Sequence, residues 1–129
     1  MEYIYVVDSA SLVLKMINYC VVNPHVKDTE ITVIHQINGW IIRLKSPYLL
    51  TAQQYGDAKA FFSELGFTYR PNVQINLVFC SLDMGESVVT VMEDYNVAII
   101  SHGSADITEM EAFRLQFSRG LGYRPETLA

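Results

Sequence analysis

Between Glu30 and Lys45, two runs rich in β-branched residues flank Asn38-Gly39, and apolar and polar residues alternate after this pair. An Asn-Gly pair favours a type I′ turn, because that turn needs a positive φ at both central residues. The segment therefore predicts a β-hairpin whose second strand has one apolar and one largely polar face. These two faces carry Trp40, Ile42 and Leu44 on the first, and Ile41, Arg43 and Lys45 on the second.

Segments on either side of the hairpin show helical spacing. Residues 3–7 predict a short buried strand, and apolar residues three or four positions apart from 12 to 21 predict a helix. That helix is expected to begin near Ser9 and to end before Pro24, since proline disfavours helical geometry in the preceding residue. A second helix is predicted from Thr51 to Leu65, with Gly66 directly after its end.

Residues 73–80 predict a further strand, because apolar and polar side chains alternate in VQINLVFC. The order up to this point is β-α-β-β-α-β, which is the ferredoxin-like order. It predicts an antiparallel sheet of four strands with both helices on one face. The fold class expected from the sequence is therefore α+β.

Residues 82–129 are expected to add a ββα extension to this core. Strands are predicted over 87–92 and 97–101. Residues 104–106 are expected to lead into a third helix, whose apolar stripe is Met110, Phe113, Phe117 and Leu121. The whole chain is expected to be one domain, with residues 1–81 as core and 82–129 as an acidic extension. Residues 62–71 and 117–125, which end the second and third predicted helices, resemble each other. Residues 51–71 and 104–125 are therefore either a true duplication or two segments that end a helix with the same residue types.

Charge is distributed unevenly along the 129 residues, whose formal net charge is −5. Residues 1–81 hold six acidic and six basic residues, whereas 82–129 hold eight acidic and three basic ones. A protein that binds nucleic acid through phosphate contacts needs a basic surface, so this composition disfavours direct nucleic-acid binding. No apolar run reaches the roughly 20 residues of a membrane-spanning helix, and no membrane association is expected.

The two cysteines, Cys20 and Cys80, lie in apolar runs and predict buried thiols without a disulfide. The N-terminal stretch has an acidic second residue and no basic region, so it does not predict a signal peptide. A cytoplasmic location is expected. No spacing of histidine, cysteine or carboxylate residues matches a metal site, and no cofactor is expected.

The acidic residues Asp83, Glu86, Glu93 and Asp94 are candidates for binding a basic protein partner. A solvated acidic surface explains the same residues without any partner. Aromatic residues are numerous, with eight tyrosines, six phenylalanines and one tryptophan. An exposed sheet face with an apolar patch, formed by Ile41, Val78, Cys80 and Val88, would then favour a homodimer.

Small-molecule binding is the alternative. The β-α-β-β-α-β order resembles that of ACT-type regulatory domains, which bind ligands at dimer interfaces. Arginines next to tyrosines could grip an anionic nucleotide or an amino acid. The candidates are Tyr69, Arg70, Tyr123 and Arg124, together with Ser101 and His102.

Catalysis is the third hypothesis, in which His102 would act as general base and Ser101 as the nucleophile of a hydrolase. No complete catalytic motif surrounds these two residues, and we assign no catalytic residue. The sequence therefore favours a non-catalytic regulatory protein that binds another macromolecule, as small inhibitors and immunity proteins do.

Overall fold

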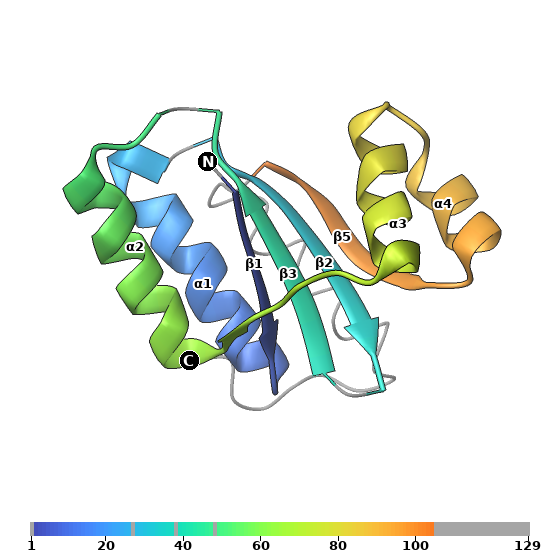
Figure 1. Cartoon of the computed structure of the whole chain (residues 1–129), viewed down its shortest axis with the longest axis horizontal. Helices are drawn as coiled ribbons and strands as arrows, with labels where there is room; N and C mark the ends of the chain where they lie inside the picture. The colour runs from blue at the N-terminus through green and yellow to red at the C-terminus, as the bar shows by residue number, and fades with distance from the viewer. Residues whose placement is uncertain (1, 27, 38, 48, 105–129) are drawn as a thin grey trace.

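The computed structural model describes residues 2–26, 28–37, 39–47 and 49–104 of the chain. A five-stranded antiparallel sheet with the order β4-β1-β3-β2-β5 lies between two pairs of helices (Figure 1). The α+β class is confirmed. The elements are β1 Glu2–Val7, α1 Ala10–Val22, η1 Pro24–Val26, β2 Glu30–Gln36, β3 Gly39–Lys45, α2 Ala52–Leu65, β4 Phe67–Thr68, α3 Val73–Asp83, α4 Val88–Tyr95 and β5 Ala98–Ser104.

The predicted hairpin forms the centre of the sheet. Strands β2 and β3 pair in antiparallel register from Glu30 opposite Lys45 to Gln36 opposite Gly39. Strand β1 pairs with the other side of β3, and β5 pairs with the outer side of β2. Trp40 is buried in the larger apolar core together with residues of α1 and α2. The prediction that the first two helices cover one apolar face of the sheet is confirmed.

Local capping explains where α1 and α2 begin. The Ser9 hydroxyl accepts a hydrogen bond from the amide of Leu12, and Thr51 forms a capping box with Gln54. Tyr19 of α1 stacks on Phe61 of α2 with ring centroids 4.6 Å apart. This ring contact joins the two helices into one layer over β1 and β3, shown on the left of Figure 1.

Two predicted strands are helices instead. Residues 73–80 lie in α3, and residues 88–92 lie in α4. The alternation in 73–80 was misleading because α3 is apolar on two opposite sides, a pattern that hides its 3.6-residue period. The fourth strand is the two-residue β4, which pairs with Tyr5 and Val6 of β1. Helix α3 also crosses the predicted boundary at residue 81.

Helices α3 and α4 cover the second face of the sheet. Residues of these helices form a second core with Ile34, Ile41 and Ile99 of three neighbouring strands. The predicted exposed apolar patch on this face is therefore wrong, since Ile41 and Val78 are buried there. The strand predicted over 97–101 is confirmed as β5, whereas the third predicted helix lies outside the described residues.

Candidate functional site

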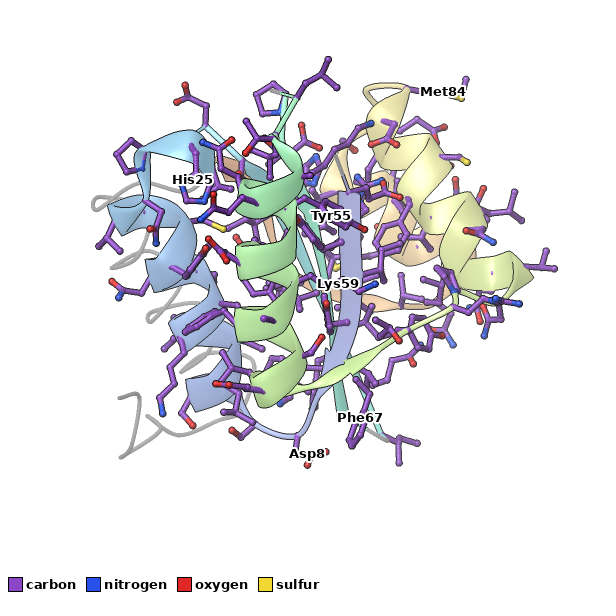
Figure 2. The ribbon with its side chains drawn as sticks, turned by 60° about the vertical axis from the view of Figure 1, so that its left-hand side comes forward. Asp8, His25, Tyr55, Lys59, Phe67 and Met84 are labelled. Carbon is purple, nitrogen blue, oxygen red and sulfur yellow. The ribbon has the colours of Figure 1, made fainter. Side chains whose placement is uncertain are left out.

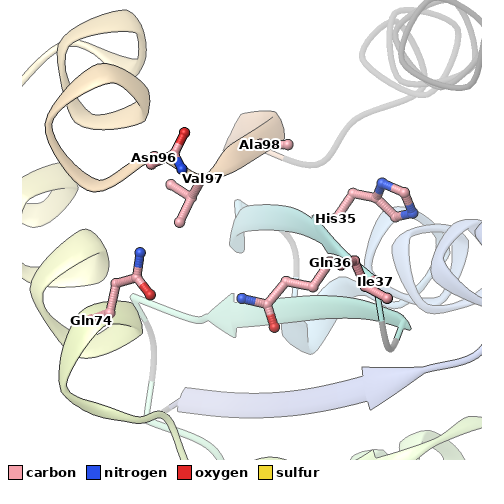
Figure 3. Close-up of a pocket in the computed structure, with 7 residues that line it drawn as sticks. All are labelled: His35, Gln36, Ile37, Gln74, Asn96, Val97 and Ala98. Atoms are coloured by element: carbon pink, nitrogen blue, oxygen red, sulfur yellow. The ribbon is translucent and has the colours of Figure 1, made fainter.

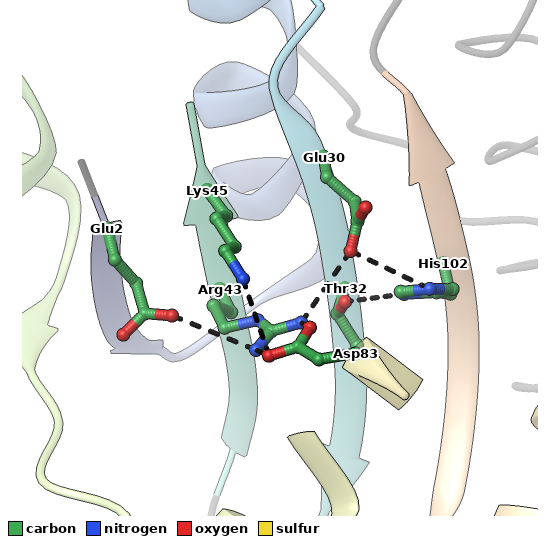
Figure 4. Close-up of polar contacts among 7 residues, drawn as sticks. All are labelled: Glu2, Glu30, Thr32, Arg43, Lys45, Asp83 and His102. Atoms are coloured by element: carbon green, nitrogen blue, oxygen red, sulfur yellow. Dashed lines mark hydrogen bonds and ion pairs between the residues drawn. The ribbon is translucent and has the colours of Figure 1, made fainter. Parts of the chain in front are cut away.

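Charged residues gather on the α3 side of the sheet, at the end where β1 begins and β5 ends. The strand register places Thr32 between Arg43 and His102, and places Lys45 between Glu2 and Glu30. Asp83, the last residue of α3, reaches this group from above the sheet (Figure 4). We call these seven residues the charged cluster: Glu2, Glu30, Thr32, Arg43, Lys45, Asp83 and His102.

Arg43 is the centre of the charged cluster, with a side chain that is only 2% exposed. Its guanidinium donates two hydrogen bonds to the carboxylate of Asp83, at 2.7 and 3.0 Å, and its carbon lies 4.5 Å from the centre of the Phe79 ring. Glu2 and Glu30 lie 3.7 Å away on either side. This bidentate pair is the strong form of a charge-assisted bond, and it fixes the end of α3 to the sheet.

The pKa of the Asp83 carboxyl is lowered, mainly by the hydrogen bonds from Arg43 and further by the charges of Arg43 and Lys45. Partial burial opposes this effect. Arg43 Nε is also buried, and it donates to no residue that the structure describes. The cluster is therefore an ion network around a buried arginine, and the carboxylates and Lys45 in this network remain partly exposed.

His102 contacts a hydroxyl, but not that of Ser101. Its Nδ1 lies 2.7 Å from Thr32 Oγ1, and its Nε2 lies 3.7 Å from Glu30. Ser101 precedes His102 in β5, and successive strand residues point to opposite faces. Thr32 has no exposed surface, so a substrate cannot reach its hydroxyl in this conformation. These contacts join β5 to β2, while the hydrolase hypothesis stays a prediction.

The four acidic candidates are not brought together. Asp83 is bonded to Arg43, whereas Glu86 lies in the turn before α4 and Glu93 and Asp94 lie near the end of α4. Those last three side chains are exposed. Tyr69 and Arg70 line a shallow hollow of about 300 Å³ after β4, away from Ser101 and His102. Tyr123 and Arg124 lie outside the described residues.

The outer face of α3 carries apolar side chains, most of which lie in the segment that the sequence predicted to be a strand. Val73, Leu77 and Met84 are 76%, 46% and 84% exposed, and Cys80 between them is exposed as well. At 100° per residue these four positions fall within an arc of about 60°. They lie opposite Ile75, Val78 and Leu82, which face the core. The spacing i, i+4, i+7, i+11 was the signal that could have revealed this outer stripe.

The two thiols differ in environment. Cys20 is buried, and burial raises the pKa of its thiol to about 12. Cys80 is exposed on the outer face of α3, contrary to the prediction that it is buried. Both are free thiols. Within the described part of the chain, no group of three histidine, cysteine or carboxylate residues is arranged to hold a metal ion.

A larger cavity, of about 490 Å³, lies at the opposite end of the sheet from the charged cluster (Figure 3). It is bordered by the end of β2, the first turn of α3 and the connection from α4 to β5. Sequence reasoning missed it, because its walls come from three segments that are far apart in the chain and that only the fold brings together.

No family model, no curated protein and no solved structure matches this chain. Among the described residues, every helix is too short or too polar to cross a bilayer. The function must therefore be inferred from the charged cluster, the outer stripe of α3 and the cavity themselves.

Proposed function

We propose that this protein is a non-catalytic interaction module that binds another protein through the outer surface of α3 and α4. The observation that carries this proposal is the apolar stripe of Val73, Leu77, Cys80 and Met84 on a helix whose opposite side is already buried. Figure 2 shows Met84 at the tip of the helix pair, directed away from the rest of the molecule. Isolated exposed apolar residues are common, but an aligned stripe marks a binding surface.

The size of the stripe suits a helix packed against it. Fully burying an aliphatic side chain contributes about 1.5–3 kcal/mol, so covering Val73, Leu77 and Met84 would supply several kcal/mol. Residues spaced i, i+4 form the ridges that fit the grooves of another helix. An amphipathic helix of the partner is thus the expected occupant.

Charge indicates the polar chemistry of that partner. Glu86 is exposed in the turn between α3 and α4, Glu93 and Asp94 are exposed on α4, and Val89 lies one helical turn before Glu93 on the same side of α4. Val89 is exposed too. An apolar strip bordered by lysine or arginine would complement this surface, and complementary charge mainly raises the association rate and the specificity.

Cys80 allows the proposal to be tested without disturbing the fold. A photoreactive maleimide should attach to Cys80 alone, because the thiol of Cys20 is buried. After illumination in an extract of the source organism, we expect one predominant cross-linked protein. A Cys80→Ala, Asn18→Cys variant carries the same probe on the exposed side of α1 and serves as the control.

A matched pair of substitutions sharpens the result. Leu77→Asp should abolish the cross-link while leaving the thermal midpoint nearly unchanged, whereas Asn18→Asp should affect neither. Raising the salt concentration should weaken capture, since exposed charges are screened. Equal cross-linking from both probe positions, or a cross-link that survives Leu77→Asp, would refute the proposal. A cross-link to a second copy of the chain would support a homodimer instead.

We also propose that residues 2–68 form a ferredoxin-like β-α-β-β-α-β unit. The antiparallel order β4-β1-β3-β2, and the place of α1 and α2 in one core, support this. In this interpretation α3, α4 and β5 are additions that cover the second face of the sheet. The proposed binding surface then belongs to the addition. An experimental structure whose β4 does not pair with β1 would overturn this assignment.

A further inference from the structure

The cavity of about 490 Å³ has the size of a small-molecule site, because such sites commonly measure about 300–1,000 Å³. Its walls include Gln36 at the end of β2, Gln74 in the first turn of α3 and Val97 before β5. Figure 3 shows these three side chains extending towards the space between them, whereas His35 extends away from it. Two carboxamides and a branched apolar side chain thus face one hollow.

Contacts behind the walls hold this hollow in shape. The His35 ring packs on Trp40 with centroids 4.3 Å apart. The Gln74 amide donates to the carbonyl of Tyr95, which joins the start of α3 to the end of α4. Asn96 ends α4 in the left-handed conformation at φ 54°, and this turn directs the chain into β5. These contacts hold the ends of β2, α3 and α4 in place around the hollow.

The chemistry of the lining favours an uncharged ligand. None of the described lining residues is an aspartate, glutamate, lysine or arginine. The Gln36 side chain makes no hydrogen bond to any residue that the structure describes. The Gln74 amide nitrogen donates to Tyr95, whereas its side-chain oxygen accepts no hydrogen bond from a described residue. A ligand that offers donors and acceptors side by side, but no charge, fits this set.

We propose that this cavity binds a flat uncharged heterocycle of the nucleobase type. A carboxamide places a donor next to an acceptor, which is the pairing that glutamine and asparagine use on the edge of an adenine. The methyl groups of Val97 would lie against the flat face of the ring. A phosphate would meet no positive side chain among the described walls, so the base and not the phosphate is what this site recognises.

This inference is independent of the proposed protein partner. The cavity opens at the end of the sheet beside Gln36, whereas the apolar stripe lies along the outer side of α3. Failure of either experiment leaves the other proposal standing.

Calorimetric titration of the full chain with adenosine, guanosine, cytidine and uridine tests the assignment. At least one nucleoside should bind saturably with one site per chain. Gln36→Leu should weaken that binding about tenfold or more, in line with the loss of one bidentate contact. Gln53→Leu makes the same change on the exposed surface of α2 and should leave the affinity unchanged.

A cavity-filling variant and a phosphorylated ligand complete the test. Val97→Trp fills the cavity and should abolish binding, with circular dichroism checking that the variant folds. The 5′-monophosphate of the best nucleoside should bind no more tightly than the nucleoside. Absence of saturable binding at millimolar concentration, binding that survives both cavity variants, or markedly tighter binding of the monophosphate would each overturn the proposal.

Discussion

The bond between Arg43 and Asp83 yields the sharpest prediction about stability. Asp83→Asn removes the negative partner of a guanidinium that is only 2% exposed. Removing one member of a fully buried ion pair costs about 3–5 kcal/mol. The Asp83 side chain is 32% exposed, and Glu2 and Glu30 remain 3.7 Å from Arg43, so we expect a smaller loss of about 2–3 kcal/mol.

Arg43→Met should cost less than Asp83→Asn, although it removes the other member of the same pair. Methionine fills the buried space with apolar atoms. The Asp83 carboxylate can then be hydrated by solvent and keep its contact with Lys45. Replacing a buried charge by an apolar side chain of similar size is often neutral. We expect a change within about 1 kcal/mol. In the Arg43→Met background, Asp83→Asn should then have almost no effect, a non-additivity of about 2 kcal/mol.

Urea unfolding monitored by the fluorescence of Trp40 measures all four free energies, because this single tryptophan is buried against the core. Asp94→Asn is the control, since Asp94 is exposed on α4 and bonds to no described residue. An Asp83→Asn cost below about 0.5 kcal/mol, or the same cost with and without Arg43, would refute the reasoning.

Lowering the pH should reproduce the effect of Asp83→Asn. The pKa of this carboxyl is lowered from 3.8 in the folded state, so its bond to Arg43 stabilises the fold above that value. The contribution is lost as the pH falls through the lower folded-state pKa. The difference in unfolding free energy between the wild type and Asp83→Asn should therefore shrink below about pH 4, and a constant difference would contradict the assignment.

Two further predictions concern glycines and thiols. Gly66→Ala should destabilise the protein by about 2 kcal/mol or more, because the added methyl would collide with the backbone and side chains of β1 such as Val7. Gly56→Ala has open space in α2 and should stabilise the protein by about 0.5–1 kcal/mol. Thermal unfolding measures both changes, and a change of the same sign in both variants would refute this description of the packing. A thiol reagent should modify Cys80 rapidly in the native protein and Cys20 only after unfolding, and rapid modification of both would contradict the burial of Cys20.

Local chemistry explains which elements could be predicted from the sequence. The hairpin followed from the two β-branched runs and from the alternation after Asn38-Gly39. The predicted turn position was wrong, because Gly39 pairs with Gln36 as the first residue of β3 and is not a central residue of the turn. The starts of α1 and α2 followed from capping residues that act within three positions of the cap. These signals depend on neighbours in the chain, so the rest of the fold does not alter them.

Helices α3 and α4 show where such signals fail. The outer stripe of α3 places Val73 and Leu77 where an ordinary surface helix has polar residues, so its apolar residues do not mark a single face. Asn72 does cap α3, by accepting from the amide of Ile75, and its place after Pro71 was a usable start signal. In α4 the β-branched run of residues 88–91 favours a strand, but packing of Val91 in the second core overrides that preference.

The charged cluster could not be predicted because its members are distant in sequence. Asp83 is 40 residues from Arg43, and His102 is 70 residues from Thr32. The sequence contained one sign of it, namely an arginine flanked by apolar residues in the second strand of the hairpin. A central strand position buries its side chain, and a buried arginine needs a carboxylate partner. The identity of that carboxylate depends on the placement of α3, which was mistaken for a strand.

The same helix connects the stability of this protein with its proposed binding. On its inner side, α3 packs Phe79 and Leu82 into the second core and fastens Asp83 to the sheet. Those contacts fix the direction in which Leu77 and Met84 project. A partner that meets an already ordered stripe loses less entropy on binding than one that must order it. The two apolar sides of α3 thus differ: the inner side orients the helix, and the outer side is where we propose that a partner binds.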